Sequence, residues 1–138
     1  MSHLARRVLI VDDCRDYTDS LQMLLELNQC EVRSAYDGPA ALEIAEVFRP
    51  DVVLLDLCLP HMSGYEIASA LRRLAERQEA MRIVAISGIS RKQDIARALA
   101  AGFDAHLTKP AEISDVLQVI QEAAPQRSTL VAEPASAR

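Results

Sequence analysis

Short apolar runs alternate along the chain with longer segments whose apolar residues recur every three or four positions. Five short segments are predicted to be strands: 7–11, 31–35, 51–55, 81–86 and 105–107. The apolar runs in 7–11 and 51–55 are typical of strands that are buried on both faces. The helical spacing predicts five amphipathic helices: 15–28, 40–48, 65–76, 91–101 and 111–124. Strict alternation of strand and helix favours parallel strands and right-handed crossovers. The pattern therefore predicts an α/β fold with a doubly wound, five-stranded parallel sheet.

Two of these helices show the apolar spacing clearly. In the first helix the apolar residues at helical spacing are Tyr17, Leu21, Leu24 and Leu25. In the last helix the expected buried stripe is Ile113, Val116, Leu117 and Ile120. Each stripe predicts the face that the helix turns toward the sheet.

Composition limits what such a domain can do. The 138 residues carry a formal net charge of −5, and half of them are hydrophobic, which is ordinary for a globular domain. An acidic balance disfavours binding to nucleic acid or anionic lipid, because both require basic patches. No apolar run is long enough to span a bilayer, so we expect a cytoplasmic protein without direct membrane contact. The cysteines Cys14, Cys30 and Cys58 form no CxxC pair and are expected to be reduced thiols.

The end of the chain differs from the rest. Residues 125–138 contain two prolines, few large apolar residues and no periodicity, which predicts a flexible tail after a single domain at 1–124. A segment of that length is too short for an output domain of even about 50 residues. We therefore expect the output to come from a partner protein.

Polar side chains follow four of the five predicted strands. Asp12 and Asp13 follow the first strand, Asp56 the third, Ser87 the fourth and Lys109 the fifth. The carboxyl ends of parallel strands meet at one edge of a sheet, so these side chains should lie together.

Three carboxylates at one edge need a counterion. Two unit charges of the same sign about 4 Å apart cost roughly 1 kcal/mol in water and about 4 kcal/mol at an effective dielectric constant of 20. Oxygen ligands without a neighbouring His or Cys cluster suit Mg²⁺, which also prefers substrate phosphate. Lys109 would then be free to face an anion.

Four stretches carry a family resemblance: Val-Leu-Ile-Val-Asp-Asp at 8–13, the segment 51–66, Ile-Val-Ala-Ile-Ser at 83–87 and Ala-Gly-Phe-Asp-Ala-His-Leu-Thr-Lys-Pro at 101–110. With these stretches the chain resembles the receiver domain of two-component response regulators. The resemblance implies a flavodoxin-like fold with the strand order 2-1-3-4-5.

The resemblance also implies roles for the residues at the sheet edge. Asp56 would accept a phosphoryl group from a phosphohistidine on a histidine kinase or histidine phosphotransfer protein. Asp13, Asp56 and the backbone carbonyl of Cys58 would hold Mg²⁺, and Asp12 would act through a coordinated water. Lys109 would pair with the phosphate and the carboxylate.

Two further residues are implied as a switch. Ser87 would donate a hydrogen bond to a phosphoryl oxygen, and the ring at position 106 would then move and alter the surface of the fourth helix, fifth strand and fifth helix. His106 stands where many receivers carry Tyr or Phe, so the switch could be altered or sensitive to pH. The stretch around His106 also resembles receivers of hybrid histidine kinases, which pass the phosphoryl group on to another protein.

Other functions use similar residues. A Mg²⁺-dependent aspartate-nucleophile phosphatase of the haloacid dehalogenase type would also use Asp56, but it needs a second Asp where Cys58 stands. A flavodoxin-like binding module would share the fold, yet the loop after the first strand is acidic where a flavin phosphate requires hydroxyls and amides. A receiver that only docks and is never phosphorylated is a third alternative. The residue pattern favours a phosphorylated receiver that is not a classical enzyme.

Overall fold

The computed structural model describes residues 6–59, 61–75, 81–88 and 92–123. The strands are β1 (Arg7–Val11), β2 (Glu31–Ala35), β3 (Val52–Asp56), β4 (Arg82–Ser87) and β5 (Ala105–Thr108). The helices are α1 (Arg15–Leu27), α2 (Gly38–Phe48), α3 (Gly64–Ala75), α4 (Lys92–Ala100) and α5 (Ile113–Gln121). All strand pairs are parallel, in the order β2-β1-β3-β4-β5. The doubly wound α/β fold and its strand order are therefore confirmed.

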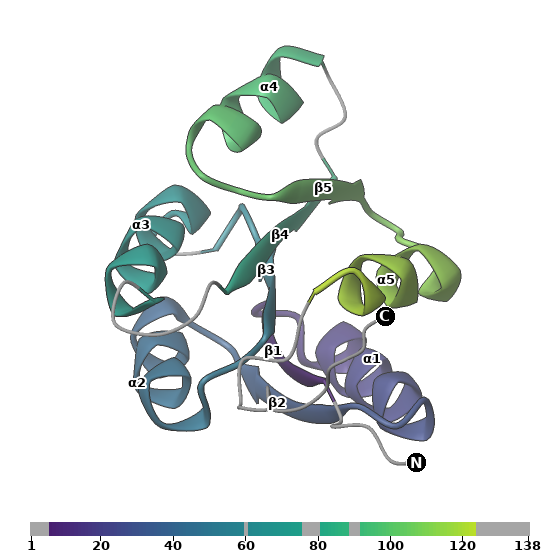
Figure 1. Ribbon diagram of the computed structural model, residues 1–138. Coiled ribbons are helices and arrows are strands. Elements are labelled where there is room, and N and C mark those ends of the chain that lie inside the picture. Colours follow the sequence, from purple (N-terminus) through teal and green to yellow (C-terminus); the bar gives the residue numbers. More distant parts are fainter. Residues whose placement is uncertain (1–5, 60, 76–80, 89–91, 124–138) are drawn as a thin grey trace, which may run out of the picture.

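The helices cover both faces of the sheet. Figure 1 shows α1 and α5 on one side and α2 and α3 on the other, with α4 beside β5 at the end of the sheet. Alternate strand residues enter two separate apolar layers: Leu9 and Val11 pack with α2 and α3, whereas Val8 and Ile10 pack with α1 and α5. Burial on both faces is the reason why the central strands β1, β3 and β4 are nearly continuous apolar runs, whereas the edge strands β2 and β5 are only partly buried. In the described ranges, no helix is long and apolar enough to cross a bilayer.

The register of the sheet brings the ends of the strands level with one another. Val11 pairs with Leu55, and Ser87 pairs with Thr108. The residues that follow β1 and β5 therefore emerge at the same edge as the last residues of β3 and β4. This edge holds the polar residues that the sequence places there.

Several helix boundaries differ from those predicted. Helix α2 begins at Gly38, two residues early, because the carboxylate of Asp37 accepts a hydrogen bond from the amide of Ala40 at 2.8 Å and caps the helix. Helix α5 begins at Ile113, two residues late, because Glu112 is still extended and acts as the N-cap. The predicted helix end at 124 and the predicted tail at 125–138 lie outside the described residues.

The buried faces of two helices also differ from the predicted stripes. In α1, Leu24 is 43% exposed while Thr18 is fully buried. The Thr18 hydroxyl lies 2.8 Å from the carbonyl of Cys14 and 3.3 Å from that of Asp12, so its burial leaves no donor unpaired. In α5, Val119 is buried although the stripe omits it, and Leu117 is only half-buried.

Candidate functional site

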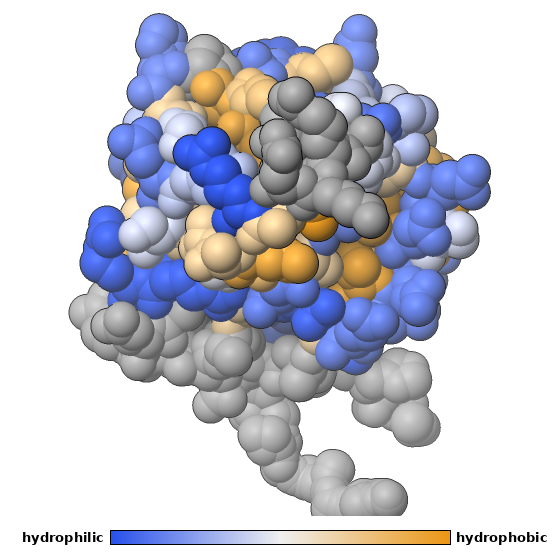
Figure 2. Space-filling model, turned by 90° about the horizontal axis from the view of Figure 1, so that it is seen from above, coloured by the Kyte–Doolittle hydropathy of each residue, from blue (hydrophilic) through white to orange (hydrophobic). Residues whose placement is uncertain are grey.

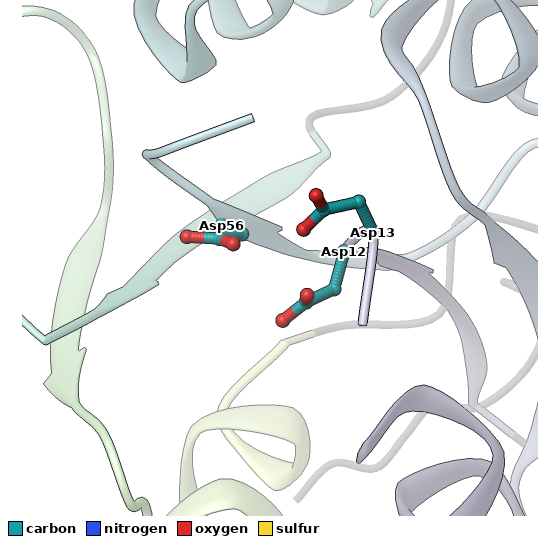
Figure 3. A group of neighbouring side chains, drawn as sticks. All are labelled: Asp12, Asp13 and Asp56. Carbon is teal, nitrogen blue, oxygen red and sulfur yellow. The ribbon is translucent and has the colours of Figure 1, made fainter. Parts of the chain in front are cut away.

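Three carboxylates meet where β1 and β3 end. One oxygen each from Asp12, Asp13 and Asp56 lies within 4.8 Å of the other two. Figure 3 shows the three side chains gathered at this edge, two from the residues after β1 and one from the last residue of β3. Asp12 and Asp56 are 3% and 6% exposed, whereas Asp13 is exposed. The structure therefore brings together the three acids that the sequence predicts for a metal site.

The two buried carboxylates are held in the same way. The backbone N–H of Cys14 donates to Oδ1 of Asp12 at 2.9 Å, and the N–H of Cys58 donates to Oδ1 of Asp56 at 3.0 Å. Each acid thus has one oxygen fixed by the loop that follows its strand. The other oxygen, Oδ2, is directed toward Lys109 in both cases.

The loop after Asp56 has little room because α3 begins against it. A Cβ on Gly64 would lie 2.8 Å from the Cα of Leu57 and 3.0 Å from the carbonyl oxygen of Asp56. Only glycine allows this close approach of backbone to backbone. Gly64 thereby keeps the loop that carries Cys58 against the site, with the side chain of Cys58 exposed at its rim.

Lys109 bridges the two buried acids. Its Nζ donates to Oδ2 of Asp12 at 2.7 Å and lies 3.6 Å from Oδ2 of Asp56. Burial lowers the pKa of Lys109, but the hydrogen bond to Asp12 and the charges of Asp56 and Asp12 outweigh burial and raise it. The ammonium is therefore paired with protein carboxylates, and the expectation that it faces an anion once a cation is bound stays a prediction. The two buried carboxylates have little contact with water, so pairing with the ammonium of Lys109 stabilises their negative charges.

The environment of Asp56 opposes its ionisation. Burial is the largest effect and raises the pKa of Asp56, and the charge of Asp12 adds to it. The N–H of Cys58 and the ammonium of Lys109 act in the opposite direction without overcoming the rise. The arrangement therefore favours a bound cation, which would relieve the repulsion between the carboxylates.

Ser87 and His106 contact each other beside this acidic group. Oγ of Ser87, which is 1% exposed, lies 3.1 Å from Nε2 of His106. His106 pairs in register with Ala85, so its ring and Ser87 are diagonal neighbours on adjacent strands. Burial lowers the pKa of His106 and favours the neutral ring. The structure thus joins directly the two residues that the sequence assigns to a switch.

One neighbour of the site is missing from the sequence prediction. The ring centroid of Tyr17 lies 4.9 Å from Nζ of Lys109. The sequence pattern places Tyr17 only in the apolar stripe of the first helix. The available signal is its place in the first turn of α1, which begins at Arg15 soon after the acidic residues that follow β1.

Comparisons with known proteins identify relatives of the chain. A family model described as the response regulator receiver domain matches residues 8–121. The transcriptional regulatory protein PdtaR of Mycobacterium tuberculosis is 37% identical over 119 residues, which cover 84% of this chain and 55% of that protein. The chain spans about half the length of most of the curated relatives that it matches.

Two solved structures are similar at 26% and 27% identity. The chemotaxis protein CheY4 of Vibrio cholerae has a TM-score of 0.80, and the match covers 88% of this chain and 100% of that chain. A response regulator from Burkholderia pseudomallei has a TM-score of 0.74, and the match covers 84% of this chain and 66% of that chain. The description of the Burkholderia structure names a phosphorylated aspartic acid, a calcium ion and citrate.

Proposed function

The chain belongs to the response regulator receiver family, whose members accept phosphoryl groups in two-component signalling, and from that premise we propose that Asp56 is its phosphoacceptor. One observation carries the assignment. Asp56 is the buried carboxylate at the end of the central strand β3, with Oδ1 held by Cys58 and Oδ2 facing the Lys109 ammonium. The phosphorylated aspartic acid in the Burkholderia structure supports the same chemistry.

The proposed reaction is the transfer of a phosphoryl group from a phosphohistidine. A carboxylate oxygen of Asp56 attacks the phosphorus, the P–N bond breaks, and its electron pair stays on the leaving imidazole. The product is an acyl phosphate on Asp56. A carboxylate is a weak nucleophile, so the protein contributes mainly positioning and neutralisation of the phosphoryl oxygens. Lys109 can supply such neutralisation because its ammonium already lies 3.6 Å from Asp56.

The donor set at the site fits Mg²⁺. Asp12, Asp13 and Asp56 offer hard carboxylate oxygens within 4.8 Å of one another, and the carbonyl of Cys58 would add another oxygen. A bound Mg²⁺ would neutralise charge on the transferring phosphoryl oxygens. The protein's own part is to keep one oxygen of Asp12 and one of Asp56 fixed by the N–H groups of Cys14 and Cys58.

Ser87 and His106 are proposed to form the switch. The Ser87 hydroxyl would leave its partner Nε2 of His106 and donate to a phosphoryl oxygen on Asp56. The freed imidazole could then move and change the surface formed by α4, β5 and α5. Figure 2 views the molecule from the α4 side, where hydrophobic side chains gather among hydrophilic ones, and Leu99 of α4 is 48% exposed. Such a surface suits binding of a downstream protein.

The proposed partners follow from this chemistry. A histidine kinase or histidine phosphotransfer protein would supply the phosphoryl group, and a second protein would read the altered surface. Self-phosphorylation by small donors and slow self-hydrolysis are the only reactions proposed for the chain itself. The cytoplasmic location stays a prediction.

The decisive experiment uses acetyl phosphate as a small phosphodonor. The protein is incubated with acetyl phosphate and Mg²⁺, and intact-mass spectrometry is expected to show the gain of one phosphoryl group. Asp56→Asn should abolish the gain, whereas Asp115→Asn, at an exposed acid in the first turn of α5, should retain it. An unmodified wild type, or a label that maps to another residue, would overturn the assignment. Turnover of a generic phosphomonoester would favour the phosphatase alternative instead.

A further inference from the structure

The ammonium of Lys109 has a third neighbour besides the two carboxylates. The ring centroid of Tyr17 lies 4.9 Å from Nζ, while Asp12 and Asp56 lie at 2.7 Å and 3.6 Å. A cation within about 6 Å of an aromatic centroid is attracted to the ring, and more strongly when water is partly excluded. The side chain of Lys109 is only 27% exposed. The ring is therefore a third attractive neighbour of the ammonium.

The start of α1 ties this ring to the acidic site. Thr18, the residue after Tyr17, is fully buried, and its hydroxyl is shared between the carbonyls of Asp12 and Cys14. Asp12 in turn accepts the hydrogen bond from Lys109. The ring, the ammonium and the carboxylate are therefore anchored to the same few residues of backbone.

The hydroxyl of Tyr17 takes no part in these contacts. The oxygen is buried and has no hydrogen-bond partner among the residues that the structure describes. Burial raises the pKa of Tyr17, so the phenol stays neutral at physiological pH. Nζ of Lys109 lies over the ring, so the face of the ring, and not its hydroxyl, is the part of Tyr17 that contacts the site.

We propose that Tyr17 is a positioning residue for phosphoryl transfer, whose ring holds the ammonium of Lys109 beside Oδ2 of Asp56. The inference rests on the proposed function, since it concerns the rate at which Asp56 is phosphorylated. Lysine has a flexible four-carbon stem, and without the ring its ammonium would sample more positions in water. At 3.6 Å from Asp56 the ammonium is close without a short hydrogen bond to that acid, so it can turn to an incoming phosphoryl oxygen.

The test compares the rate constants of Asp56 phosphorylation by acetyl phosphate at saturating Mg²⁺. Tyr17→Leu, which removes the ring and keeps an apolar side chain, is expected to lower the rate about five- to tenfold. Tyr17→Phe, which keeps the ring, should stay within about twofold of wild type. Tyr17→Met replaces the leucine variant if circular dichroism shows that Tyr17→Leu does not fold.

A double-mutant cycle separates positioning from a general structural role. In a Lys109→Met background, Tyr17→Leu should lower the rate by no more than about twofold, because the ring then has no ammonium to hold. Tyr36→Leu is the matched control. The guanidinium carbon of Arg15 lies 3.9 Å from the Tyr36 ring centroid, so this variant removes a cation–ring contact that does not involve Lys109, and the rate should be retained.

The outcomes are distinct. An equal loss from Tyr17→Leu in both backgrounds, a loss in Tyr17→Phe as large as in Tyr17→Leu, or no loss in Tyr17→Leu would each overturn the inference while leaving Asp56 as phosphoacceptor. A wild type that is not phosphorylated at all would instead overturn the proposed function.

Discussion

Replacing Asp56 with asparagine is expected to stabilise the protein in the absence of metal and to weaken its response to Mg²⁺. The Asp56 side chain is buried, and one of its carboxylate oxygens lies within 4.8 Å of one oxygen each of Asp12 and Asp13. Asparagine has the same shape, and its carbonyl oxygen can still accept the hydrogen bond from Cys58. The substitution therefore removes a charge without opening a cavity.

The magnitude follows from the distances. The carboxylate oxygens lie at most 4.8 Å apart, and a repulsion at that limit is worth about 3.5 kcal/mol at an effective dielectric constant of 20 and about 0.9 kcal/mol in water. The attraction between Lys109 and Asp56 at 3.6 Å is worth about 4.6 kcal/mol and 1.2 kcal/mol on the same two scales. The repulsion of Asp56 by the buried Asp12 and the weaker, more screened repulsion by Asp13 thus nearly cancel the attraction between Asp56 and Lys109. The cost of burying the charge of Asp56 then remains uncompensated. We expect a gain in the free energy of unfolding of about 1 kcal/mol.

The effect depends on pH with a defined sign. Because the pKa of Asp56 is raised above 3.8, the folded protein binds this proton more tightly than the unfolded chain. The contribution of Asp56 to stability is fully present below the unfolded pKa and is lost as pH rises through the folded pKa. Wild type should therefore lose stability relative to Asp56→Asn between about pH 4 and the raised pKa, and the difference should stay constant above it.

Urea unfolding with and without Mg²⁺ measures both parts of the prediction, with a potassium salt at matched ionic strength as the reference. At a Mg²⁺ concentration 100 times its dissociation constant, wild type should gain about 2.7 kcal/mol and Asp56→Asn much less. Asp13→Asn is the contrast, because Asp13 is exposed: metal-free stability should hardly change while the response to Mg²⁺ falls. The reasoning is refuted if Mg²⁺ stabilises wild type no more than the potassium salt, or if metal-free Asp56→Asn is less stable than wild type.

Two further predictions concern residues away from the carboxylates. Burial lowers the pKa of His106, so the unfolded chain takes up this proton more readily, and the free energy of unfolding should fall as pH drops below about 6.5. In urea titrations His106→Gln should reduce this dependence of stability on pH. An unchanged pH dependence in the variant would contradict the assignment. The guanidinium of Arg72 donates to the carbonyls of Met81 and Gly102 and to the carboxylate of Asp104. Arg72→Met should therefore lower the free energy of unfolding by about 2 kcal/mol. A loss under about 0.5 kcal/mol in urea unfolding would contradict this account.

The fold was predictable because the three central strands, β1, β3 and β4, are buried on both faces. A run such as 52–55 is apolar throughout and can hardly be anything except a central strand between polar loops. Helix faces were less predictable, as Thr18 and Leu24 show. A threonine can be buried when its hydroxyl bonds a carbonyl of the preceding turn, and a leucine can be left exposed at the border of a stripe. The hydrophobic pattern alone therefore predicts neither the burial of Thr18 nor the exposure of Leu24.

Some residues of the site could likewise be predicted from the sequence, and others could not. Residues such as Asp56 and Ser87 were predictable because each ends a strand, and the topology of a parallel sheet brings all strand ends to one edge. The pairing of Lys109 with Asp12 was not predictable, because it depends on how far a flexible side chain reaches once burial has removed water from the acids. Tyr17 was missed because it enters from the first turn of a helix. When site residues at this edge of a parallel sheet are predicted from sequence, the first turn of the helix after each strand should be considered together with the strand ends.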